Sequence, residues 1–337
     1  MNAPAPALDA ELRDALRARL DDLTPRQATQ AVERLIANYR GRTPTDAPVL
    51  RDAADVAAYA AYRMPATFEA VRAALDAFRA RAGDWTPARH VDVGGGTGAA
   101  TWAVADAWPG SAHETTVVDW AQPALDLGRT LARDASHPAL RTATWRREPI
   151  GPALALPDAD LVTVSYVLGE LTDRDRASVV AEAARAGRAV VVVEPGTPPG
   201  YARVIEARAR LIEAGFTVLA PCPHDAACPI EEGADWCHFA ARVSRSSLHR
   251  QVKGGSLPYE DEKFSYVAAV REGEPGAARA RVVRHPQTRK GQVLLDLCTR
   301  DEGLRRVTVS KRQGEVYRAA RDAEWGDVWP PRSASED

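Results

Sequence analysis

The spacing of apolar and polar positions changes twice along the chain. Residues 1–85 have helical spacing, and Thr24-Pro25 has the form of an N-cap followed by a proline in the first helical turn. A second helix is expected to begin after a break at about Pro65 and to run to Ala82. The chain is therefore predicted to open with an N-terminal helical region.

From residue 89 the pattern becomes an alternation of short strands and helices. Such an alternation predicts an α/β fold with a parallel sheet covered on both faces. Near-continuous apolar runs such as 189–193 are typical of strands buried on both faces. The expected strands are 90–93, 115–118, 141–146, 160–166, 189–193 and 216–219, with helices at 99–107, 122–134, 173–186 and 200–214. We assign this Rossmann-like core to residues 86–220.

The alternation stops after residue 220. A segment rich in cysteine and proline, 221–237, leads into an expected basic helix at about 242–253. Antiparallel strands are then expected at 264–271, 279–284, 291–299 and 304–310. Residues 221–330 are therefore predicted to form a β-rich C-terminal extension.

The strand at 90–93 ends in a glycine-rich turn, Asp92-Val93-Gly94-Gly95-Gly96-Thr97-Gly98, which runs into the next helix. Glycine lets a backbone approach a ligand closely, and a helix N-terminus favours negatively charged groups. Asp119 ends the next strand, where a carboxylate can accept hydrogen bonds from ribose hydroxyls. The arrangement predicts a nucleotide-like cofactor.

Two cofactors fit this loop. The acid-x-Gly-x-Gly-x-Gly pattern is that of class I S-adenosylmethionine-dependent methyltransferases, and the looser nicotinamide fingerprint Gly-x-Gly-x-x-Ala also fits. The preceding acid, the third glycine and the helical region ahead of the first strand favour S-adenosylmethionine. The expected cofactor contacts are Asp92, Gly94, Gly95, Gly96, Gly98, Asp119, Trp120 and Ser165.

Residues 165–171 follow the fourth strand, at the position that lies beside the methyl donor in methyltransferases. They lack the Asn/Asp-Pro-Pro-Tyr signature of many enzymes that methylate exocyclic amines. Glu170 and Tyr166 are candidates for acid–base or positioning roles. A carboxylate near a helix start also interacts favourably with the helix dipole, so Glu170 could instead have a purely structural role.

The chain has four cysteines: Cys222, Cys228, Cys237 and Cys298. We see no secretory signal and no apolar run long enough for a membrane helix, so a cytoplasmic location is expected. There, clustered cysteines favour a metal site over disulfides. Four thiolates suit a [4Fe–4S] cluster or tetrahedral zinc. The irregular spacing favours iron–sulfur, whereas His224 and His238 keep a zinc site open.

The net charge of −2 conceals a basic segment. Residues 241–321 hold 18 lysines and arginines against 9 acidic residues. A basic segment on an acidic body suggests a polyanionic partner, although a solvated surface of mixed charge is the alternative.

Several of these features resemble those of the methyltransferase-like assembly factors of the mitochondrial small ribosomal subunit and their bacterial relatives. The resemblance rests on the glycine loop, the turn 194–198, the cysteine segment, 259–266 and 310–312. It implies a class I fold that binds S-adenosylmethionine, an iron–sulfur site held by the four cysteines, and contact with small-subunit ribosomal RNA. Candidate RNA contacts are Arg242, Arg245, Arg250, Lys253, Lys311 and Arg312.

Three functions are compatible with the sequence. The first is a methyltransferase that acts on ribosomal RNA. The second is an RNA-binding assembly factor with little or no turnover, which uses the cofactor fold and the cluster structurally. The third is a small-molecule methyltransferase, which leaves the basic segment unexplained. A monomer is expected in each case.

Overall fold

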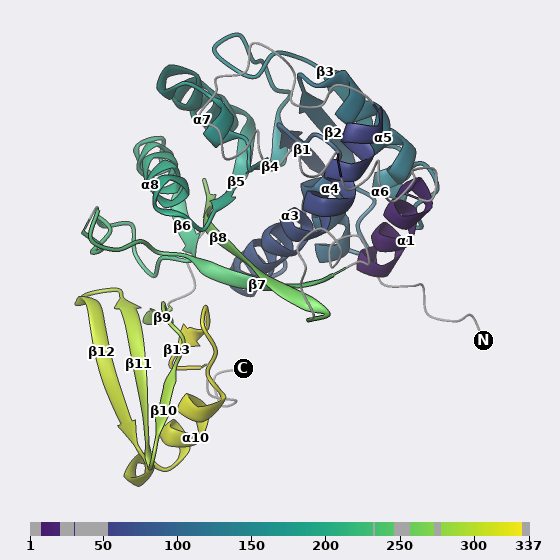
Figure 1. Ribbon diagram of the computed structural model, residues 1–337. Helices are drawn as coiled ribbons and strands as arrows, with labels where there is room; N and C mark the ends of the chain where they lie inside the picture. The colour runs from purple at the N-terminus through teal and green to yellow at the C-terminus, as the bar shows by residue number, and fades with distance from the viewer. Residues whose placement is uncertain are drawn as a thin grey trace.

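The computed structural model describes residues 8–20, 30, 53–231, 233–245, 257–272 and 278–331. These residues form two β-sheets that lie next to each other, an eight-stranded main sheet and a five-stranded C-terminal sheet (Figure 1). The helix expected at Thr24-Pro25 lies outside the described residues.

The main sheet has the strand order β3-β2-β1-β4-β5-β8-β6, and β7 pairs with β8. Strands β1 to β5 run parallel to one another, whereas β8 is antiparallel to β5, β6 and β7. The strands are β1 (Arg89–Val93), β2 (Glu114–Asp119), β3 (Thr144–Arg147), β4 (Ala159–Ser165), β5 (Gly187–Pro195), β6 (Thr217–Ala220), β7 (Phe239–Ser244) and β8 (Tyr259–Val270).

Helices cover both faces of the main sheet (Figure 1). They are α1 (Leu8–Leu20), α3 (Ala53–Ala82), α4 (Ala99–Ala107), α5 (Gln122–Ala132), α6 (Pro138–Arg141), α7 (Asp173–Ala186) and α8 (Pro198–Glu213), with a 3₁₀ turn η1 (Leu168–Glu170). Alternate residues of β5 serve the two cores: Val191 and Val193 pack with α3 and α4, and Val190 and Val192 with α7 and α8. The predicted α/β alternation is confirmed.

Helix α3 continues through Pro65, so the predicted helix break at that residue is wrong. A proline inside a helix removes one backbone hydrogen bond and tends to bend the helix. Burial offsets that loss, because Phe68, Leu75 and Phe78 on the same helix are fully buried in the core between α3, α4 and the sheet.

The predicted basic helix is also wrong where the structure describes it, because residues 239–244 form strand β7. Phe239, Ala241 and Val243 are buried in alternation with more exposed neighbours, which is the two-residue period of a strand. Strands β7 and β8 belong to the main sheet. The sheet therefore extends past the predicted boundary at residue 220.

The C-terminal sheet is antiparallel throughout and has its own small core. Its elements are β9 (Ala280–Val282), β10 (Gln287–Arg289), β11 (Gln292–Thr299), β12 (Gly303–Ser310) and β13 (Val328–Trp329), with η2 (Lys311–Gln313) and α10 (Glu315–Asp322). Val293, Leu295 and Leu297 of β11 face α10 and Trp329 within this core. Among the described residues, the second sheet thus begins at β9 and not at residue 221.

Candidate cofactor and cysteine sites

The glycine loop joins the end of β1 to the start of α4. Gly94, Gly96 and Gly98 have φ angles of 64°, 51° and 86°, a region that L side chains rarely adopt. A Cβ on Gly94 would lie 2.5 Å from Val167, and one on Gly98 would lie 2.7 Å from the Trp145 ring. Both positions therefore need glycine for internal packing as well as for conformation.

Gly96 differs from the other glycines of the loop. The nearest atom to a Cβ built there is Oδ2 of Asp119, at 3.8 Å, so this face of the loop is open. The helix α4 that follows has no side-chain cap and no acidic residue in its first turn. Free N–H groups at a helix start favour a carboxylate or phosphate.

Asp119, at the end of β2, holds the loop from the neighbouring strand. Its carboxylate accepts hydrogen bonds from Gly96 N at 2.9 Å and from Ala121 N at 2.7 Å, and burial raises its pKa. Each carboxylate oxygen has room for a second donor. The next residue in the chain, Trp120, is 42% exposed, so an accessible aromatic side chain directly follows this carboxylate.

Asp92 lies beneath the loop and has no exposed surface. Its two carboxylate oxygens accept hydrogen bonds from Thr101 at 3.0 Å and Thr163 at 2.8 Å. Burial raises its pKa to about 7. The structure thus places Asp92 as a support for the loop, because its carboxylate is covered by Gly95.

The segment after β4 turns sharply at Tyr166, which has a φ of 57°. The Tyr166 hydroxyl donates to Oε1 of Glu262 at 3.0 Å, and burial raises the pKa of Tyr166. Ser165 is buried beside it. Glu262 was not identified from the sequence as a site residue, because it lies in β8, far from Tyr166 in the chain.

Glu170 lies in η1 at the same edge of the sheet, with its side chain at the surface. The protein around its carboxyl group removes enough water, and the charges of Asp119 and Glu194 add enough repulsion, to raise its pKa to about 7. Glu194 is buried, accepts a hydrogen bond from Leu168 N and pairs with Arg203 at 2.6 Å. Glu170 is thus the exposed member of a group of three carboxylates.

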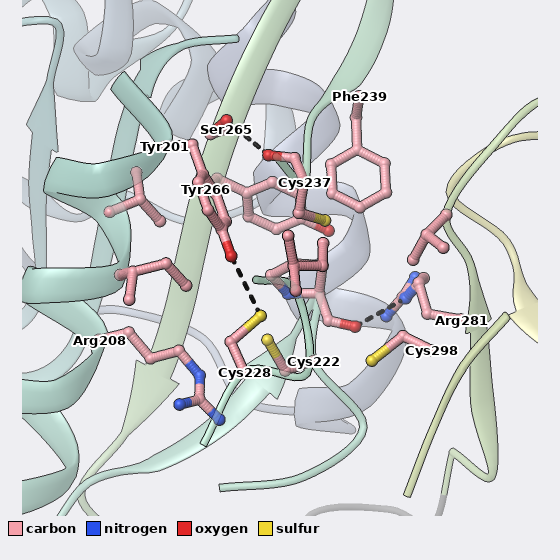
Figure 2. Close-up of a pocket in the computed structure, with 15 residues that line it drawn as sticks. Tyr201, Arg208, Cys222, Cys228, Cys237, Phe239, Ser265, Tyr266, Arg281 and Cys298 are labelled. Carbon is pink, nitrogen blue, oxygen red and sulfur yellow. Dashed lines mark hydrogen bonds between the residues drawn. The ribbon is translucent and has the colours of Figure 1, made fainter. Parts of the chain in front are cut away.

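The four cysteines line one pocket at the junction of the two sheets (Figure 2). Cys222, Cys228 and Cys237 come from the connection between β6 and β7, and Cys298 comes from β11 of the C-terminal sheet. The pocket has an empty volume of about 510 Å³, part of it open to solvent. The fold brings together three cysteines close in sequence and one that is distant.

The thiols lie among few hydrogen-bonding groups. The Tyr201 hydroxyl is 3.2 Å from the Cys228 sulfur, and the sulfur of Cys298 is 3.6 Å from Nε2 of His224. Burial, followed by the charges of neighbouring cysteines, raises the pKa of Cys298 to about 12 and that of Cys237 well above its ordinary value. Without compensating positive charge these thiols would stay protonated.

Two buried arginines supply positive charge on opposite sides of the sulfur atoms (Figure 2). Arg208 is 5% exposed and donates to the carbonyls of His224 and Ala226. Arg281 is 4% exposed and donates to the carbonyls of Pro221 and Gly326. Nε of Arg208 and Nη2 of Arg281 are buried without a hydrogen-bond partner.

Sequence reasoning missed both arginines. The signal was present, because Arg208 lies on the face of α8 that carries Val204 and Leu211, and Arg281 interrupts the apolar run 280–283. A charged residue at a core-facing position is rare unless it is paired. The described part of the chain contains no group of three or more His, Cys, Asp or Glu side chains arranged to hold a metal ion.

The candidate RNA contacts fall into three groups. Arg242 pairs with Asp261 at 3.0 Å, and Arg245 pairs with Glu260 at 3.1 Å, both across the β7–β8 ladder. Lys311 and Arg312 are exposed at the end of β12. Arg250 and Lys253 lie outside the described residues. No helix in the described ranges is long and apolar enough to cross a membrane.

The main sheet defines the class of the protein. Its strand order, with the antiparallel β8 inserted between β5 and β6 and the glycine loop after β1, is that of class I S-adenosylmethionine-dependent methyltransferases. The profile of the family described as mitochondrial small ribosomal subunit Rsm22 matches residues 53–330. The chain belongs to this family, as its sequence features predicted.

Two relatives and one solved structure illustrate the likeness. The mitochondrial ribosome assembly protein METTL17 of Homo sapiens is 31% identical over 81% of this chain and 62% of its own length. The mitochondrial ribosome assembly protein RSM22 of Saccharomyces cerevisiae is 24% identical over 33% of this chain and 28% of its own. Magnesium protoporphyrin IX methyltransferase from Synechocystis, with bound SAH, superimposes with a TM-score of 0.40 at 12% identity over 61% of this chain and 84% of its own.

The chain thus spans less than two thirds of the length of these curated relatives. Their names contradict the cytoplasmic location expected from the sequence, because both are mitochondrial proteins. That expectation was wrong because a missing secretory signal does not distinguish the cytoplasm from the mitochondrion.

Proposed function

We propose that this chain is a methyltransferase-like assembly factor of the small ribosomal subunit that binds S-adenosylmethionine and ribosomal RNA. The observation that carries the proposal is the family match from residue 53 to 330, which includes both sheets and the cysteine pocket between them. The names of the relatives, which state ribosome assembly, support the same role.

The edge of the sheet around Gly96 supports S-adenosylmethionine as the cofactor. The first N–H groups of α4 would bind its methionine carboxylate, Asp119 would accept hydrogen bonds from its ribose, and Trp120 offers a ring for its adenine. When bound, this cofactor supplies an electrophilic methyl group. Calorimetry should detect binding that Asp119→Asn weakens, and a wild-type protein that binds no cofactor would refute the assignment.

The cysteine pocket supports a group held by four thiolates, and we propose a [4Fe–4S] cluster, with zinc as the alternative. Four thiolates around iron or zinc leave a net negative charge, which the unpaired N–H groups of Arg208 and Arg281 would stabilise. Protein purified without oxygen should be brown and contain iron and acid-labile sulfide. A colourless protein with stoichiometric zinc would overturn the iron–sulfur assignment.

The candidate RNA contacts that the structure describes differ in whether their charges are already paired with carboxylates. Lys311 and Arg312 are exposed and have no carboxylate partner among the described residues, whereas Arg242 and Arg245 already have one. We therefore expect Lys311→Ala to weaken binding to small-subunit RNA more than Arg242→Ala. Affinity should also fall steeply with salt, and an affinity that does not respond to salt would count against phosphate contacts.

Catalytic methyl transfer is a second candidate, and Glu170 is the observation that favours it. A surface carboxyl group with a pKa of about 7, beside Asp119, suits proton transfer near neutral pH. Labelled S-adenosylmethionine and small subunits from a deletion strain should then give single-turnover transfer that Glu170→Gln slows. If no label appears in the RNA, methyl transfer is excluded and the role in RNA binding and assembly remains.

A further inference from the structure

Three arginines of the C-terminal sheet share one face near the cysteine pocket. Arg281 lies opposite Cys298 in the β9–β11 ladder, and Arg300 N donates to Arg279 O at 2.9 Å. Opposite residues of an antiparallel pair point to the same face, and so do residues two apart on one strand. Arg279 and Arg300 continue this pairing just outside β9 and β11, so Arg279, Arg281 and Arg300 share the face of Cys298.

The connection that follows β6 holds two of these side chains, and α3 adds a fourth arginine. Nε of Arg281 donates to Pro221 O at 3.0 Å, and Nε of Arg300 donates to Pro223 O at 3.2 Å. Arg81, in the last turn of α3, approaches Arg281 and Arg300 from the part of the molecule that contains the main sheet. Burial, followed by the positive charges of Arg281 and Arg300, lowers the pKa of Arg81 to about 10. We call Arg81, Arg279, Arg281 and Arg300 the arginine seam.

The arginine seam lacks an anion among the described residues. None of its four members forms an ion pair there, and the hydrogen bonds of Arg281 and Arg300 go to backbone carbonyls rather than to carboxylates. Nε and Nη1 of Arg81 and Nη2 of Arg281 are buried without an acceptor. Neighbouring cations repel one another, and a buried guanidinium donor without an acceptor is unfavourable. An anion from outside the described chain would relieve both costs.

The cysteine pocket accounts for only part of this charge. Arg281 lines the pocket, but Arg81, Arg279 and Arg300 do not. The positive charges of these three arginines therefore lie outside the cysteine pocket. Arg279 and Arg300 are exposed at the rim of the junction, where a ligand from solvent can reach them. Arginine presents a planar set of donors that matches the oxygens of a phosphate group.

We propose that the arginine seam binds a phosphate group, and that the source of this group is the backbone of RNA. The proposal rests on the RNA-binding function proposed above and assigns it a surface that differs from the sequence candidates. The seam joins α3 of the main domain to the C-terminal sheet, so a bound backbone would contact both parts of the molecule at their junction.

The test compares two double variants with the wild-type holoprotein. Arg81→Gln/Arg300→Gln removes two charges from the arginine seam, and Arg129→Gln/Arg133→Gln removes two at the C-terminal end of α5. In fluorescence anisotropy with a small-subunit RNA fragment, the seam variant should lose about tenfold or more in affinity. The slope of log affinity against log salt should fall by about 1 per arginine. The control variant should match the wild type, and iron and sulfide contents should be equal in all three.

Equal affinity and slope in the seam and control variants would overturn the proposal. If the double variant fails to fold, the exposed Arg300→Gln alone provides the same comparison. If the wild type binds no RNA, the proposed RNA-binding function fails. Binding of inorganic phosphate then tests whether the arginine seam is an anion site. A phosphate-induced rise in melting temperature, against chloride at equal ionic strength, that is lost in the seam variant supports a site for free phosphate. An equal rise in both proteins refutes the site.

Discussion

The Tyr166 hydroxyl and the Glu262 carboxylate are joined by a 3.0 Å hydrogen bond, and the same oxygen of Glu262 accepts from Arg63 at 3.0 Å. The contact links the end of β4 to β8 and α3. Tyr166 has a positive φ, which is unfavourable for a non-glycine residue unless its surroundings hold it. This hydrogen bond provides one such restraint beside the proposed methyl donor.

Glu262→Gln should therefore destabilise the protein by about 1–3 kcal/mol, because it removes the negative charge that faces Arg63 within a partly buried cluster. Tyr166→Phe removes only a neutral donor and should cost about 1 kcal/mol. Urea denaturation measures both. A Glu262→Gln variant no less stable than Tyr166→Phe would contradict the importance of the charge.

Asp92→Asn should change stability in a pH-dependent way. The pKa of Asp92 is raised from its ordinary value near 4 to about 7 by burial, so the folded state holds a proton that the unfolded state releases. Wild-type stability attributable to this group is present below pH 4 and is lost as the pH rises to 7. The neutral asparagine has no such loss.

The stability of Asp92→Asn relative to wild type should thus improve by on the order of 1 kcal/mol per pH unit between pH 4 and 7 and then level off. Urea denaturation across that range measures the difference, in which other titrating groups cancel. A difference that does not vary with pH would show that the folded-state pKa of Asp92 is unshifted.

Alanine substitutions in the glycine loop should separate folding from cofactor binding. Gly98→Ala places a Cβ 2.7 Å from Trp145 at a φ of 86°, so melting temperature should fall clearly. Gly96→Ala meets open space and should cost only about 1–2 kcal/mol for its positive φ. Calorimetry should nevertheless show that Gly96→Ala loses S-adenosylmethionine affinity, and retained affinity would place the cofactor elsewhere.

Cys298→Ser should loosen the C-terminal sheet, because this residue is the only one of the four cysteines that comes from it. Iron and sulfide should fall, and amide exchange should speed up in β9 and β11 but not in β4. Thr299→Ser, a conservative change at the next position, serves as the control. Unchanged exchange in β11 would mean that the pocket does not hold the two sheets together.

Local patterns in the sequence were sufficient for most of the main sheet. The apolar run 189–193 and the helix 173–186 were predicted within a few residues, because strands buried on both faces and capped helices have strong local signals. Strand β7 was mistaken for a helix because Arg242 and Arg245 are also three residues apart. The alternation of Phe239, Ala241 and Val243 indicates a strand, but this pattern is short, and the pairing with β8 that stabilises the strand is visible only in the structure.

For the candidate sites too, residues close together in the sequence could be predicted, whereas contacts between distant segments could not. The glycine loop is contiguous, so its residues could be named before the fold was known. Glu262 beside Tyr166, and Arg81 beside Arg281, join segments far apart in the chain, and no periodicity encodes such contacts. Sequence could name Cys298 as a ligand only through family resemblance; the structure brings its strand to the cysteine segment.

The position of β8 and Cys298 has a consequence for biosynthesis. A ribosome releases Cys222, Cys228 and Cys237 before β8 has filled the gap between β5 and β6, and well before Cys298 emerges. The nascent chain therefore exposes three thiols beside an unfinished sheet edge. Completion of the sheet and of the pocket must wait until β8 and β11 have been made, and until then the three thiols are open to oxidation and mispairing.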